Sequence, residues 1–166
     1  MSIYLVIPLL LIAGVLQASV VPHLALWGVF PDLPALVVVS WSLLEGTRQG
    51  VVWGFIAGLF VDLFSGAPFG AATLSLMAVG ALSGLGQATV FRTHVTLPLI
   101  AMFLATLVYD LLFLLIVQIA GTPVAWLESL MRIILPSAAL NTVLVPLVYL
   151  VMRGLHTWLV REEMEW

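Results

Sequence analysis

Three acids and one arginine stand in otherwise apolar stretches of this 166-residue chain: Asp32, Asp62, Asp110 and Arg132. Charges held away from water need a partner, so such groups can bind a metal ion, relay a proton or hold a charged protein. No two of the acids stand three or four residues apart, the spacing at which helical side chains meet, which disfavours a metal site. Two interpretations stay open: a polar pocket or partner-docking site, and helix caps with hydrogen bonds between helices.

Motifs of known catalytic sites are absent from the sequence. It holds no HExxH zinc motif, no GxSxG elbow, no P-loop and no cysteine, which also excludes disulfides and thiolate metal sites. Its three histidines, His23, His94 and His156, are expected in loops or at helix ends, where a solvated imidazole needs no special role. We predict no enzymatic activity, no cofactor and no metal.

Composition places these residues in a membrane protein. The chain is 63% hydrophobic and only 8% charged, with a mean hydropathy of +1.24, whereas soluble domains carry roughly 25% charged residues. Its apolar runs are continuous rather than alternating, which indicates helices and not strands. The net charge of −3 is thinly spread and gives no footprint for nucleic acid. The predicted fold is an all-α integral membrane bundle with one transmembrane domain over residues 1–166.

Six membrane helices are expected to position the charged side chains. The stretch 33–64 would be roughly 48 Å long as one helix, against about 30 Å of hydrocarbon, and the polar patch Glu45–Gln49 divides it. A short amphipathic helix over 124–135 is expected at the membrane surface, followed by a span that starts at Pro136 and a cytoplasmic tail over 154–166. The predicted membrane helices are 3–21, 33–45, 49–64, 69–90, 96–120 and 136–153.

Glycines recur at every fourth residue along the third of these helices. Residues four apart lie nearly above one another on a helix, so the glycines form a stripe against which a second helix can pack closely. Asp62 lies in the same register and is therefore expected to face protein rather than lipid, as Asp32 is expected to cap the helix that starts at Leu33. The predicted packing positions are Gly46, Gly50, Gly54, Gly58, Gly66 and Gly70.

Arginine placement predicts the orientation, because cytoplasmic loops carry an excess of basic residues. With six spans, Arg132 falls on one side of the membrane and the other four arginines on the opposite side, so both termini are cytoplasmic. Those four are Arg48, Arg92, Arg153 and Arg161. If 33–64 were one tilted span, a five-span chain with an outer N-terminus would place the last three of them inside as well. Both interpretations put the C-terminus inside and Asp62 and Asp110 toward the outer face.

A loop, a glycine pattern and a second turn follow one another over residues 17–84. The residues that carry them are Gln17, Pro31, Asp32, Leu33, Gly46, Gly50, Gly54, Phe55, Gly58, Leu59, Asp62, Leu63, Gly66, Gly70, Gly80 and Gly84. The order of a PDL loop, a short helix and a G-x3-G-x3-GF-x2-GL-x2-D pattern resembles the bacterial rod shape-determining protein MreD family. From residue 95 onward the resemblance rests on hydropathy.

The resemblance implies a component of the cell-elongation machinery, the elongasome, in the cytoplasmic (inner) membrane. Its implied role is to scaffold or regulate peptidoglycan synthesis and so maintain rod shape. The implied partners are the bitopic protein MreC, the wall polymerase RodA with its penicillin-binding transpeptidase, and indirectly the actin-like MreB. The implied fold is a six-helix bundle similar to the substrate-binding S-components of energy-coupling-factor vitamin transporters.

That similarity of fold supplies a rival function, a vitamin-binding S-component. S-components dock to their energising subunit through an A-x3-A pattern on the first helix, but Ala13 and Ala18 stand five residues apart here. A pocket with three acids is also less suited to an apolar or anionic vitamin. A passive membrane spacer without a fixed partner is the third interpretation.

Overall fold

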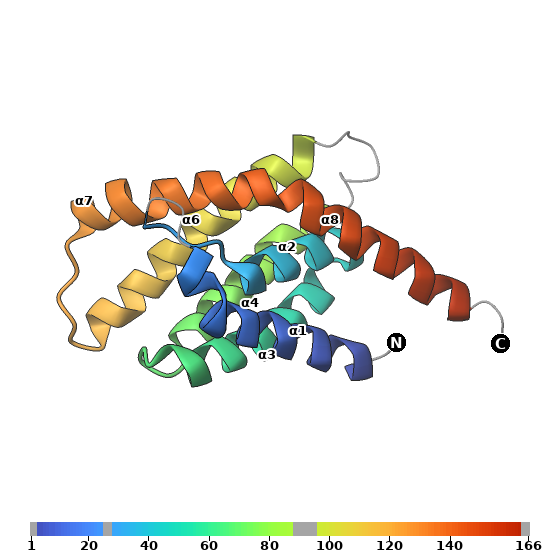
Figure 1. Ribbon diagram of the computed structural model, residues 1–166, viewed down its shortest axis with the longest axis horizontal. Coiled ribbons are helices and arrows are strands. Elements are labelled where there is room, and N and C mark those ends of the chain that lie inside the picture. The colour runs from blue at the N-terminus through green and yellow to red at the C-terminus, as the bar shows by residue number, and fades with distance from the viewer. Residues whose placement is uncertain (1–2, 25–27, 88–95, 164–166) are drawn as a thin grey trace.

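The structure is a computed structural model that describes residues 3–24, 28–87 and 96–163. All of its long elements are helices. Within those ranges it has six helices of at least 13 residues and no β-strand, which confirms the predicted all-α fold. They are α1 (Ile3–Ser19), α2 (Leu33–Glu45), α3 (Thr47–Ser65), α4 (Ala71–Gly84), α6 (Thr96–Ile119) and α8 (Leu135–Glu163) (Figure 1). The shorter pieces are η1 (Val21–Leu24), α7 (Trp126–Ser129) and η2 (Leu130–Ile134).

Helix α2 forms the centre of the bundle. Every residue from Pro34 to Leu44 is buried, and the helix contacts α1, α3, α4, α6 and α8. A helix that is apolar on almost all sides is typical of the interior of a protein or of a membrane span, and here other helices cover α2. At about 20 Å, α2 is too short to cross 30 Å of hydrocarbon unaided. Trp41 of α2 stacks on Trp53 of α3 with ring centroids 4.4 Å apart, which ties the two consecutive helices together.

The break between α2 and α3 is a single glycine. Gly46 has a φ of 92°, a conformation that side chains disfavour, and its N–H closes α2 by donating to Ser42 O at 2.8 Å. The polar residues after it were expected to lie outside the helices, with α3 starting at residue 49. Helix α3 instead starts at Thr47, because the first turn of a helix has free N–H groups and accepts polar side chains.

Helix α4 is shorter than the expected helix over 69–90. It starts at Ala71 because Gly70, with a φ of 99°, turns the chain immediately before it. It ends at Gly84, and a turn through Leu85 and Gly86 follows. The expected end of this helix at residue 90, and with it Arg92 and His94, lies outside the described residues.

Helix α8 departs from prediction most clearly. A separate surface helix over 124–135 and a new span from Pro136 were expected, but α7, η2 and α8 follow one another without a break. Pro136 lacks an N–H and crowds the preceding turn, which normally ends a helix. Here the turn ahead of it is π-helical, with Leu135 N–H bonding to Leu130 O, and the wider turn accommodates the ring. Nor does the helix stop near residue 153, since it extends to Glu163 and takes in most of the expected tail.

Two helices of the described part are long and apolar enough to cross a membrane by themselves. They are α6, with 24 residues and a hydropathy of 2.5, and the continuous stretch Trp126–Arg161, with 36 residues and a hydropathy of 1.9. Helices α6 and α8 lie side by side, and the tip of this hairpin extends beyond the other helices (Figure 1). Large apolar side chains such as Ile100, Leu104, Val143 and Leu147 are exposed along it. So much exposed apolar surface is compatible with lipid and unfavourable in water.

Candidate functional site

The closest helix contact is made by glycines of α3 against α4. A Cβ atom added at Gly50, Gly54 or Gly58 would collide with backbone atoms of α4. The same holds in the other direction, since a Cβ at Gly80 or Gly84 would collide with the backbone of the segment Gly46–Gly50. The two backbones therefore touch along much of the length of α4. In a membrane such close approach strengthens van der Waals contact, which takes the place of the hydrophobic effect between helices.

The last two glycines of the predicted packing stripe have another role. Gly66 and Gly70 have φ values of 65° and 99°, and no atom lies within 4 Å of a Cβ built at either one. Helix α3 ends at Ser65, so the helical register that predicted packing does not reach them. They turn the chain from α3 into α4 and are not packing positions. Gly46 combines both roles, with a φ of 92° and the Gln87 side chain against it.

Asp62, near the end of α3, caps the start of α4. Its Oδ1 accepts a hydrogen bond from Ala72 N–H at 3.0 Å. Its Oδ2 accepts from the N–H groups of Gly70 and Thr73, both at 3.0 Å, and from the Thr73 hydroxyl at 2.6 Å. The first N–H groups of a helix have no partner within the helix, and Gly70 at the N-cap position has no side chain to supply one. A carboxylate from the neighbouring helix takes the place of the missing cap.

This arrangement decides what Asp62 can do chemically. The side chain is buried, with 5% of its surface exposed, and both of its oxygens are engaged by donors. Its negative charge also lies at the positive end of the α4 dipole. A carboxylate held in this way is neither a free proton acceptor nor an exposed contact for another protein. Its position supports the cap interpretation over the docking one.

A second polar cluster joins four helices at the Asp32 end of α2. Asp32 caps α2 as expected, with Oδ1 accepting from Ala35 N–H at 3.0 Å. Asn141 of α8 accepts from Asp32 N–H at 2.9 Å and donates to the Thr106 hydroxyl of α6 at 3.3 Å. Gln17 of α1 accepts from Leu33 N–H at 2.9 Å. Together these side chains satisfy N–H groups at the start of α2 and hold α1, α6 and α8 around it.

The remaining predicted site residues do not assemble into one pocket. Within the described part of the chain, no hydrogen bond or ion pair joins any two of Asp32, Asp62, Asp110 and Arg132. Arg132 is exposed on η2 and pairs with Glu128 at 3.1 Å. Asp110 is half-buried on α6, and its Oδ2 lacks a hydrogen-bond partner. No group of three or more His, Cys, Asp or Glu side chains suited to a metal ion occurs among the described residues.

Asp32 differs from an ordinary surface carboxylate in its electrostatics. Removal of water from its carboxyl group raises the pKa from 3.8 to about 6, although the hydrogen bond from Ala35 N–H opposes that rise. The charged form is disfavoured because a carboxylate loses hydration in the protein without gaining a cation. Asp32 therefore retains its proton over part of the mildly acidic range.

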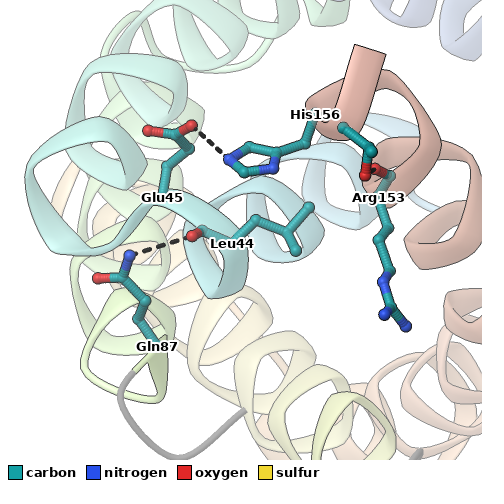
Figure 2. Close-up of polar contacts among 6 residues, drawn as sticks. Leu44, Glu45, Gln87, Arg153 and His156 are labelled. Atoms are coloured by element: carbon teal, nitrogen blue, oxygen red, sulfur yellow. Dashed lines mark hydrogen bonds and ion pairs between the residues drawn. The ribbon is translucent and has the colours of Figure 1, made fainter. Parts of the chain in front are cut away.

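The opposite end of α2 carries a close contact between a histidine and a carboxylate that the sequence gave no reason to expect. His156 Nε2 of α8 lies 2.8 Å from Glu45 Oε1 at the end of α2, and both side chains are mostly buried, at 26% and 17% exposure (Figure 2). The imidazole also meets the Trp41 ring edge-on, with centroids 5.7 Å apart. Gln87 donates to Leu44 O at 3.0 Å beside the pair, while Arg153 points away from it (Figure 2). These contacts hold α8 and the segment that follows α4 against α2.

Comparison with known families gives a match that covers most of the molecule. The sequence model of the rod shape-determining protein MreD matches residues 1–155 of the 166. The chain belongs to the MreD family. No curated protein and no solved structure matches it. The predicted likeness to transporter S-components therefore remains a prediction, while family membership establishes a membrane protein that determines rod shape.

Within this MreD-family chain, polar contacts join the helices at both ends of α2 and at the turn from α3 into α4. Sequence reasoning found Asp32 and Asp62 by residue type, but it found neither the N–H groups that Asp62 binds nor the pairing of Glu45 with His156. The matched region ends at residue 155, directly before His156. The position of Asp62 ahead of a glycine turn could have predicted its capping role. A helix that starts directly after glycine has no side chain at the N-cap position, so another residue must supply the cap.

Proposed function

We propose that this MreD-family protein is a non-enzymatic, multi-pass component of the rod complex in the cytoplasmic membrane. It scaffolds or regulates peptidoglycan synthesis together with MreC, with RodA and its penicillin-binding transpeptidase as further partners and MreB as an indirect one. The observation that carries the proposal is the family match over residues 1–155. A scaffolding role also fits polar side chains that bind helix ends and neighbouring helices, as those of Asp62 and Asn141 do.

We propose further that both termini are cytoplasmic. Arg48, Arg153 and Arg161 are exposed, and the Glu45–His156 pair brings the end of α2 next to the part of α8 that carries the last two. Arg132 lies at the other end of this long helix, beyond Pro136. An excess of arginine on one side supports a cytoplasmic location for that side. The Asp32 cluster is then outer and the Glu45–His156 pair is inner.

The tip of the α6–α8 hairpin is the part of the outer surface best suited to an extracytoplasmic partner such as MreC. Trp126 of α7 donates to Gln118 Oε1 at 2.8 Å, which fixes the tip, and Glu128 and Arg132 are exposed on it. A hollow at this surface is lined by Ala125, Trp126, Leu127, Glu128, Met131 and Arg132. Exposed apolar side chains beside a charged pair suit a protein contact with a polar rim.

Depletion of the protein in its native host tests the proposed function. Rod-shaped cells are expected to become round as the protein is lost, and to recover when the chain is supplied again, with growth medium and vitamin supply unchanged. Restoration of growth by an added vitamin without any change of shape would instead support a transport function. Unchanged shape and growth would support a passive spacer and contradict the proposal.

A further inference from the structure

An apolar groove of about 420 Å³ lies between α4 and α6. Its lining comes from both helices, from Gly86 and from Leu43 of α2, and among the described lining residues Ser83 alone has a polar side chain. Ser83 and Gly86 on one side and Ala101 and Ala105 on the other are small, so the two helices leave a space between them. Neither the glycine interface nor the polar clusters reach this side of the bundle.

The rims of the groove face the surroundings of the protein. Leu82 of α4 and Ile100 and Leu104 of α6 belong to the groove lining, and all three are more than half exposed. Leu43 at the bottom is fully buried. The groove therefore opens between Leu82 on one side and Ile100 and Leu104 on the other, and α6 as a whole has the hydropathy of a membrane span. With α6 placed across a membrane, lipid hydrocarbon would border this opening.

The length of the groove matches one leaflet of a bilayer. Along α6 the lining runs from Leu97, in the first turn, to Val108. That separation is roughly 16 Å along a helix, while half of the hydrocarbon core is about 15 Å thick. The groove thus extends from the membrane surface near the start of α6 to about the middle of the membrane.

We propose that this groove binds one acyl chain of a phospholipid from the leaflet at the start of α6. The headgroup would lie at the end of the groove where Leu97 starts its lining, and the chain would run along Ala101 and Ala105 toward Val108. A transmembrane helix is about 10 Å wide with its side chains, too wide to reach a buried residue such as Leu43 between two packed helices. A flexible chain of single methylenes fills an irregular space and restores the dispersion contacts that its lining lacks.

A photoreactive phospholipid tests the proposal on the full-length protein. The chain is reconstituted in phosphatidylethanolamine–phosphatidylglycerol vesicles that contain a trace of phospholipid with a diazirine midway along one acyl chain, and labelled residues are mapped by mass spectrometry. Labelling of Leu43 and Ala105, which are buried, is expected to exceed that of Leu147 and Leu150, which are exposed on α8 outside the groove. Labelling confined to exposed residues would mean general lipid contact only and would overturn the proposal.

A groove-filling variant gives an independent measurement. Ala101→Phe places a ring in the groove and is expected to reduce labelling of Leu43 several-fold. Leu115→Phe is the matched control, because Leu115 is exposed on the same helix and does not line the groove. Undiminished labelling of Leu43 in a folded Ala101→Phe protein would contradict the proposal. If that variant does not fold, the labelling pattern of the unaltered chain still decides the question.

Discussion

Gly54→Leu is expected to lower the free energy of unfolding by about 3 kcal/mol or more, because overpacking of a tight interface cannot be relieved by side-chain movement. At Gly54 even a Cβ atom would collide with the backbone of Leu76 and Met77. Helices α3 and α4 would have to separate along the whole interface. Gly54→Ala is expected to lower the free energy of unfolding as well, but by less than Gly54→Leu. Unfolding of the purified protein in mixed detergent micelles measures the difference.

Val52→Leu is the matched control for this prediction. Val52 lies on the same helix two residues earlier, but its side chain is exposed, so a larger one can extend away from the protein. Its stability and abundance in the membrane are expected to equal those of the unaltered chain. Equal stability of Gly54→Leu and Val52→Leu would show that the α3–α4 backbones are not in contact.

Asp62→Ala is expected to cost about 4 kcal/mol or more, because it leaves several donors at the start of α4 without a partner and each buried, unpaired donor costs about 1–3 kcal/mol. The donors are the N–H groups of Gly70, Ala72 and Thr73 and the hydroxyl of Thr73. Helix α4 would lose its first turn, and its contact with α3 would weaken with it. The same unfolding assay measures the loss.

Asp62→Asn tests whether residue 62 must supply two acceptor oxygens to cap α4 or must only be polar. An amide looks like an adequate substitute when only the sequence is known. The structure predicts a clear loss, about 2 kcal/mol, because one of the two acceptors becomes an NH₂ group facing N–H donors. Thr73→Val removes the hydroxyl donor alone and is expected to cost about 1 kcal/mol. Full stability of Asp62→Asn would contradict the capping account.

Local sequence patterns predicted the helices and the glycine contact because both depend on residues close together in the chain. The bounds of α2 equal those of the expected helix over 33–45, since Asp32 and Gly46 mark its two ends. Gly50, Gly54 and Gly58, which stand four residues apart, all lie against the backbone of α4. The same spacing was misleading at Gly66 and Gly70, because a register has meaning only while the helix continues.

Contacts between distant residues could not be predicted in this way. Glu45 and His156 stand far apart in the chain, and their pairing depends on how far α8 extends. Pro136 and the polar tail led to a predicted helix that was too short to include His156. The π-helical turn at Leu130–Ile134 has no sequence signature that distinguishes it from an ordinary helix end before proline. Asn141 likewise lies within α8 and accepts a hydrogen bond from the Asp32 N–H group, which is distant in the chain.

Separate crossing of the membrane by α2 and α3 is the central claim of this account, because it places the Asp32 cluster and the Glu45–His156 pair on opposite sides. The chain has no cysteine, so single cysteines can be introduced without other changes. Phe30 precedes α2 and Arg48 lies in the first turn of α3, and both are exposed. In intact cells a membrane-impermeant thiol reagent is expected to label Phe30→Cys, and to label Arg48→Cys only after permeabilisation. Labelling of both positions from the same side would contradict the account.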